Sequence, residues 1–223
     1  MKRTTLAQRQ LPAYTRREEI ANMVTHIAGG GFGVVVLLWC VLKAALYGTA
    51  WDVVGACIYG ASMVVLYTVS SIYHGLKLST GKKVMQIIDH CTIYFLIGGT
   101  YTPILFSGIR PMFPGWAWTI FGLVWGCAVM AAVFTAIDLK RFRVLSMVCY
   151  IAMGWCIVIA VKPAMQAVPV PALLWILAGG IAYTVGAVLY GLGKKRRYMH
   201  TAFHAFVLLG SVLQFVGIVG YIL

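Results

Sequence analysis

Long apolar stretches with few charged side chains make up most of this chain. Seven of them lie at residues 23–47, 53–74, 85–107, 115–136, 144–161, 170–192 and 200–223. A helix needs roughly 20 apolar residues to cross a hydrocarbon core of about 30 Å. The sequence therefore predicts an all-α integral membrane protein, folded as a seven-transmembrane helix bundle. We expect one bundle domain at 23–223, preceded by a basic tail and lead-in at 1–22.

The composition excludes most soluble folds. Of the 223 residues, 61% are hydrophobic and only 10% are charged, whereas soluble domains carry about 25% charged residues. So little polar surface cannot cover the molecule in water, and membrane lipids are its expected partners. The sequence leaves homo-oligomer formation open.

The basic residues predict the orientation of the chain. With the N-terminus in the cytoplasm, only Lys43, Arg110 and Lys162 fall outside, and the other 15 of the 18 Lys and Arg residues fall in the tail and the cytoplasmic loops. Such a bias marks the cytoplasmic side of membrane proteins. It accounts for the net charge of +13 without nucleic-acid binding. We expect a multi-pass protein of the inner membrane, with the C-terminus outside.

Several polar side chains fall at one predicted depth, in the cytoplasmic half of the bilayer. His74 ends the second stretch, and Ser70 lies one turn before it on the same face. Asp89 lies one turn into the third stretch, and His200 and His204 open the seventh. Ionisable groups inside membrane helices are costly and usually functional. Their shared depth indicates one site.

A zinc site is the favoured interpretation of these residues. His200 and His204 are four residues apart, which places both imidazoles on one helix face. Catalytic zinc takes three protein ligands and keeps a fourth position open, and His74 is the natural third ligand. Asp89 is then placed to act as a base and Ser70 to bind a developing oxyanion. A hydrogen-bonded structural cluster and a proton relay are the alternatives.

Other polar residues near this depth are assigned elsewhere. His90 follows Asp89 directly, and neighbouring residues face different sides of a helix, so we place it outside the site. His26, with Asn22 and Glu19 one and two turns before it, forms a second polar stripe. We interpret this stripe as tying the lead-in to the bundle, with a role beside the site as the alternative.

The first stretch also contains a dense set of glycines, at positions 29, 30, 31 and 33. Small residues let membrane helices approach closely. We favour helix packing over ligand contact as the reason for these glycines.

Three patches of sequence resemble a known family, the bacterial haemolysin III-like proteins of the progestin and adiponectin receptor superfamily. They are Glu19-Ile-Ala-Asn22-Met-Val-Thr-His26; Ser70-Ser-Ile-Tyr-His74 with Asp89-His-Cys-Thr-Ile-Tyr94 and Gly99-Thr-Tyr-Thr-Pro103; and His200-Thr-Ala-Phe-His204. The resemblance covers residues 18–223. It implies seven helices with a cytoplasmic N-terminus, and zinc held by His74, His200 and His204. Asp89 and Ser70 would lie beside the metal. The family is related to alkaline ceramidases, zinc hydrolases that cleave lipid amide bonds.

Three functions compete for this site. The leading hypothesis is a zinc-dependent intramembrane hydrolase of a lipid amide or ester, involved in membrane-lipid homeostasis. The second is a non-enzymatic membrane sensor or regulator in which zinc is structural. A cytolytic, pore-forming protein is the third, and the almost uniformly apolar helices argue against it because they have no charged stripe to line a channel.

Overall fold

The computed structural model describes residues 4–193 and 196–223, and its regular elements are all helical. In that part of the chain, seven spans are long and apolar enough to cross a membrane, as predicted. Five are single helices: α1 (Arg16–Tyr47), α2 (Ala50–Gly75), α4 (Pro114–Asp138), α7 (Val170–Leu192) and α8 (Met199–Tyr221). The all-α, seven-helix fold class is thereby confirmed.

The other two spans are irregular. The third consists of α3 (Thr80–Pro103) and a π-helix, η1 (Ile104–Ile109). Pro103 has no backbone N–H to donate, and the helix widens directly after it. The fifth consists of α5 (Arg143–Gly154), a 3₁₀ segment η2 (Cys156–Ala160) and α6 (Val161–Ala167). It therefore continues six residues beyond the predicted end at residue 161.

Two helices begin five or more residues earlier than predicted because polar residues cap them. Thr15 and Glu18 form a capping box, so α1 begins at Arg16 rather than at residue 23. Ser79 accepts a hydrogen bond from the backbone N–H of Lys82, so α3 begins at Thr80 rather than at residue 85. Part of the predicted lead-in thus belongs to the first helix, and the domain division at residue 22 stays a prediction.

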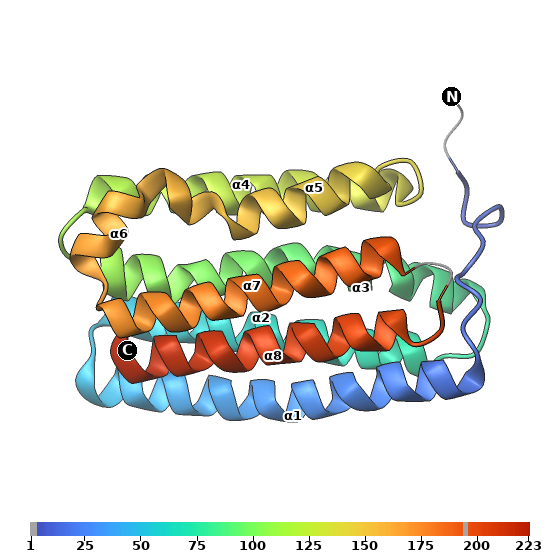
Figure 1. Cartoon of the computed structure of the whole chain (residues 1–223), viewed down its shortest axis with the longest axis horizontal. Helices are drawn as coiled ribbons and strands as arrows, with labels where there is room; N and C mark the ends of the chain where they lie inside the picture. Colours follow the sequence, from blue (N-terminus) through green and yellow to red (C-terminus); the bar gives the residue numbers. More distant parts are fainter. Residues whose placement is uncertain (1–3, 194–195) are drawn as a thin grey trace.

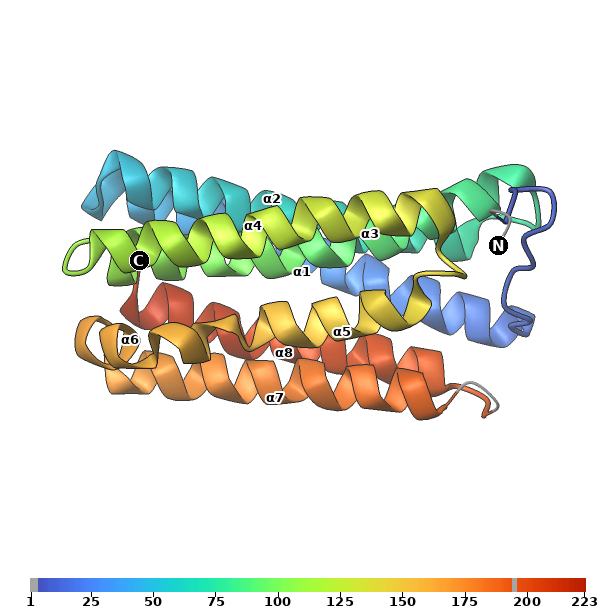
Figure 2. The same ribbon diagram turned by 90° about the horizontal axis from the view of Figure 1, so that it is seen from above.

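The helices form a bundle with α3 near its centre (Figures 1 and 2). Of the 18 most apolar consecutive residues in α3 with η1, 72% are buried inside the protein, against 22% in α7. The helix α1 packs against α2 and α8, α7 packs against α8, and α3 packs against α2 and α4. Site residues on α1, α2, α3 and α8 are therefore brought together by direct helix contacts.

Glycines set the close approach of α1 to α2. A Cβ atom on Gly29 would clash with the ring of Tyr67, and one on Gly60 would lie 2.5 Å from the Cα atom of Leu37. The helix-packing prediction is confirmed for Gly29. It is wrong for Gly31, because a Cβ atom there would meet nothing within 4 Å among the described residues.

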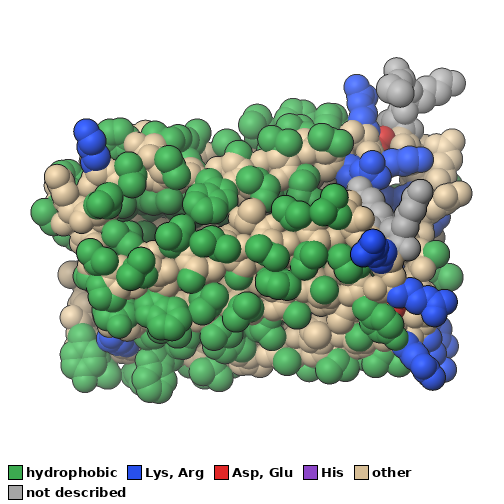
Figure 3. Space-filling view, in the orientation of Figure 1, with side chains coloured by type: hydrophobic (Ala, Val, Ile, Leu, Met, Phe, Trp, Pro, Cys, Tyr) green, Lys and Arg blue, Asp and Glu red, His purple; other side chains and the backbone are tan. Residues whose placement is uncertain are grey.

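We call the end of the bundle where α1, α3 and α8 begin the histidine end, because His74, His200 and His204 lie there. Lys and Arg side chains gather at this end, while apolar side chains cover most of the visible face (Figure 3). The helix α8 ends at the opposite end (Figure 1). This arrangement fits the predicted cytoplasmic N-terminus, which stays a prediction. Four residues counted for that prediction, Lys2, Arg3, Lys194 and Lys195, lie outside the described residues.

Candidate metal centre

Three histidines from distant parts of the chain meet at the histidine end. His74 lies in the last turn of α2, and His200 and His204 lie in the first two turns of α8. One nitrogen of each imidazole lies within 4.8 Å of a nitrogen of the other two. The structure thus brings together the three predicted ligands, and this group could hold a metal ion.

The contacts of these rings suit metal binding through Nε2. The Nδ1 of His74 donates to Oε2 of Glu19 at 2.6 Å, and the Nδ1 of His204 donates to the backbone carbonyl of Asn22 at 3.3 Å. A ring that donates from Nδ1 keeps a lone pair on Nε2. The Nε2 atoms of His74 and His200 are 3.2 Å apart. Two nitrogens on a tetrahedral zinc lie roughly 3.3 Å apart, so this pair fits such a metal, and a nitrogen of His204 lies within 4.8 Å of both.

Aromatic rings enclose one of the three candidate ligands, His200. The ring of Tyr14 stacks on it with centroids 5.1 Å apart, and the ring of Tyr190 lies 5.4 Å away. Burial raises the pKa of the Tyr14 phenol, which lies before the first helix. Sequence reasoning missed Tyr14, because a tyrosine in a basic tail carries no pattern that links it to a site.

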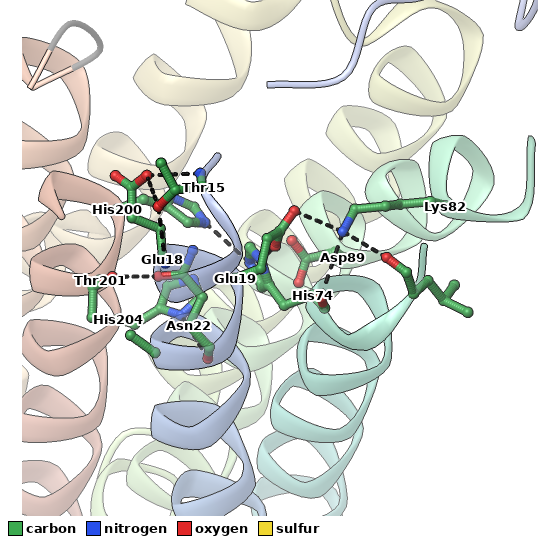
Figure 4. Close-up of polar contacts among 12 residues, drawn as sticks. Thr15, Glu18, Glu19, Asn22, His74, Lys82, Asp89, His200, Thr201 and His204 are labelled. Carbon is green, nitrogen blue, oxygen red and sulfur yellow. Dashed lines mark hydrogen bonds and ion pairs between the residues drawn. The ribbon is translucent and has the colours of Figure 1, made fainter. Parts of the chain in front are cut away.

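Asp89 and Ser70 lie beside the histidines, as predicted. Asp89 is 7% exposed and Ser70 is 1% exposed, and both line the same cavity as His200 and His204. Figure 4 shows Asp89 alongside His74. His90 is not in the group of ligand atoms, as predicted, but it lines the same cavity. Its Nδ1 donates to the backbone carbonyl of Gln86 and lies 3.7 Å from Oδ2 of Asp89, so the two neighbours do not face fully different sides.

The polar stripe on α1 contacts the ligand histidines directly. Glu19 and Asn22 accept the two Nδ1 hydrogen bonds, and the ring of His26 stacks on that of His204 with centroids 3.6 Å apart. Our favoured interpretation of the stripe, as a tie for the lead-in, was therefore too narrow. The alternative, a role beside the site, describes the contacts.

Lys82 is a second residue that sequence reasoning missed. We counted it as a loop charge that sets the topology, but it lies in the first turn of α3 and is 2% exposed. Its Nζ donates to Oε1 of Glu19 at 2.7 Å. One signal was available: Lys82 and Asp89 are seven residues apart, so they share a helix face.

Comparison with known proteins identifies the family. Residues 14–215 match the family model described as haemolysin-III related. This chain belongs to that family. It is 38% identical over 208 residues to the hemolysin-3 homolog of Bacillus subtilis, covering 93% of this chain and 96% of that protein. It is also 38% identical over 208 residues to the hemolysin-3 of Bacillus cereus, covering 93% of each chain.

A weaker similarity extends beyond bacterial members of the haemolysin-III related family. The human monocyte to macrophage differentiation factor is 23% identical over 214 residues, which cover 92% of this chain and 84% of that protein. That protein is a member of the progestin and adiponectin receptor superfamily, so the resemblance found in the sequence is confirmed. The haemolysin-III match includes every residue placed at the metal centre, from Tyr14 to His204.

A cavity of about 380 Å³ runs from the candidate metal centre of this haemolysin-III related protein toward the opposite end of the bundle. Asp89 and His200 line it at the histidine end, and Gln214, four turns along α8 from His200, lines it farther away. Most of the remaining lining is apolar. Val158 and Met165 also line it and are 58% and 66% exposed, so the cavity borders the surface that faces lipid.

Proposed function

We propose that this protein is a zinc-dependent hydrolase that cleaves an amide or ester bond of a membrane lipid from the cytoplasmic half of the bilayer. One observation carries the proposal: three imidazoles, an aspartate and a serine lie together where a long apolar cavity meets the histidine end. Membrane-lipid homeostasis is the role such an activity would serve.

The choice of zinc rests on the donor set. Three imidazole nitrogens with a position left open suit catalytic zinc, whereas calcium and magnesium prefer oxygen ligands. Zinc bound there would polarise the lipid carbonyl and lower the pKa of a water molecule to about 7.

Residues of the chain would carry out the proton transfers and stabilise the developing negative charge. Asp89 would take a proton from the attacking water while the water oxygen forms a bond to the carbonyl carbon. Ser70 would donate a hydrogen bond to the carbonyl oxygen as it gains negative charge. Asp89 would then pass the proton to the leaving amine or alcohol as the C–N or C–O bond breaks. The apolar cavity would hold the lipid chain and keep bulk water away.

A non-enzymatic sensor with structural zinc is the second candidate, and one observation favours it. Tyr14 stacks on His200 and lies 6.0 Å from His74, ring centroid to ring centroid, so the side of the histidines that faces the tail is covered. A structural site has all four metal positions filled by the protein. A cytolytic function receives no such support, and a vesicle leakage assay with no release would argue against it.

The test compares the purified wild type with Asp89→Asn in vesicles of bacterial lipid. We expect about one zinc per chain in both proteins, and release of fatty acid, measured by mass spectrometry, that is about 10²- to 10⁴-fold slower in the variant. Asp52→Asn is the matched control, because it removes the same charge at the opposite end. Zinc in both proteins with no lipid product from either would favour the sensor.

A further inference from the structure

Lys82 is buried within the membrane-spanning bundle, and its ammonium group has three hydrogen-bond acceptors. Its side chain is 3% exposed. Its Nζ donates to Oε1 of Glu19 at 2.7 Å, to the carbonyl of Leu76 at 2.9 Å and to the carbonyl of His74 at 3.5 Å. Lysine is almost never fully buried unless it is paired. The three acceptors match the three donors of the ammonium group.

Glu19 connects this lysine to a candidate metal ligand. Its two carboxylate oxygens have different partners: Oε1 accepts from Lys82, and Oε2 accepts from Nδ1 of His74 at 2.6 Å (Figure 4). Both distances are short, as expected for charge-assisted hydrogen bonds. The three side chains come from α1, α2 and α3, so the chain of contacts ties three helices together at the histidine end.

The local sequence explains how Lys82 reaches this position. Ser79 caps α3 and places Lys82 three residues later, in the first turn. The helix α2 ends at Gly75, so the carbonyls of His74 and Leu76 lie at a helix C-terminus, where carbonyls lack helical partners and a cation is favourable. Lys82 therefore meets both the end of α2 and the Glu19 carboxylate.

We infer that Lys82 and Glu19 form a positioning pair for His74. Lys82 holds the Glu19 carboxylate, and that carboxylate accepts the Nδ1 hydrogen bond of His74, which aims its Nε2 at the metal. The inference rests on the metal centre of the proposed function. Residues that hold a metal-binding histidine in this way affect metal affinity about 10- to 100-fold. A lysine that only caps α2 would leave metal affinity unchanged.

The test measures the dissociation constant for zinc by competition with a chelator, using the full chain in detergent. We expect Glu19→Gln to weaken binding by about 10- to 100-fold and Lys82→Met to weaken it by about 10-fold. Because Lys82 acts through Glu19, the double variant should bind within about 2-fold of Glu19→Gln, which is the non-additivity of a coupled pair. Lys83→Met is the matched control, since the hydrogen bonds of its Nζ to described residues go to the carbonyls of Leu6 and Ala7, away from Glu19.

Thermal unfolding of the metal-free proteins shows whether a variant loses zinc affinity because His74 is misplaced or because the fold is destabilised. If Lys82→Met does not fold, Lys82→Gln takes its place, because it removes the charge and keeps a donor for the carbonyl of Leu76. Unchanged zinc affinity in a variant of lower metal-free stability would show a helix cap and overturn the inference. Additive losses in the double variant would also overturn it. A wild type that binds no zinc would overturn the proposed metal centre and, with it, the positioning role.

Discussion

The two ends of the bundle hold their charged side chains in different ways. At the opposite end, Lys43 donates to the carbonyl of Val219 near the end of α8, and Arg110 lies over the ring of Trp51, so neither contact involves an acidic side chain. At the histidine end, the charged groups of Glu19 and Lys82 are linked to one another and to an imidazole.

Lys43 contacts the end of one helix, whereas Lys82 and Glu19 hold a residue of the candidate site. The part-buried Lys43 donates to one carbonyl, and this contact requires no third residue. A carboxylate shared between Lys82 and His74 fixes the relative positions of three helices. Buried polar networks of this kind are costly unless every member is paired. We therefore expect substitutions at the two ends to affect different properties, metal binding at one and stability alone at the other.

The largest effect should come from removing one metal ligand. We expect His204→Ala to lose zinc, from about one ion per chain to background, because two imidazoles remain where catalytic sites use three protein ligands. Elemental analysis after purification without chelators measures this loss. His90→Ala is the control, because His90 lines the same cavity but lies outside the group of ligand atoms. Equal metal content in the two variants would contradict the assignment of His204.

The second largest effect should be a loss of stability caused by a substitution between the two ends of the bundle, at Gly60. Gly60→Ala would place a Cβ atom 2.5 Å from the Cα atom of Leu37, so α1 and α2 would have to separate. Overpacking of this kind costs about 1–3 kcal/mol, which denaturant unfolding in detergent measures. Gly31→Ala adds the same methyl group on a face where nothing lies within 4 Å among the described residues. Equal losses in the two variants would argue that contact with α2 is not the cause.

Hydropathy and charge predict the spans and the depth of the site but not the rotation of its helices. The shared depth of His74, His200 and Asp89 follows from where each apolar stretch begins or ends. Whether Lys82 points into the bundle depends on how α3 is rotated and on the cap at Ser79. A basic residue beside a span is by default a topology signal. The sequence therefore indicated the candidate ligands but not the Glu19–Lys82 pair, of which Glu19 contacts the imidazole of His74.

The irregular spans mark a second limit of sequence reasoning. Pro103 is visible in the sequence, but its consequence, a π-helical turn rather than a break, depends on the burial of residues 104–106 and Ile109 in the bundle. The fifth apolar stretch was predicted to end at residue 161. Pro163 instead lies in the first turn of α6, where a missing N–H is tolerated.

The smallest effect should be that of Lys43→Met, and it tests the comparison most directly. Lys43 donates to the carbonyl of Val219 at 2.6 Å, with no acidic partner in the hydrogen bonds and ion pairs of the described residues. Losing one such hydrogen bond costs about 0.5–1.5 kcal/mol, measured by denaturant unfolding. Zinc affinity should stay within about 2-fold of the wild type, because Lys43 lies at the opposite end of the bundle and its hydrogen bond goes to Val219 rather than to a residue that holds His74. Lys82→Met removes the same charge, and we expect it to weaken zinc binding by about 10-fold. If Lys43→Met weakened zinc binding as much as Lys82→Met, loss of a positive charge in general would explain both effects, and the two ends would not differ in kind.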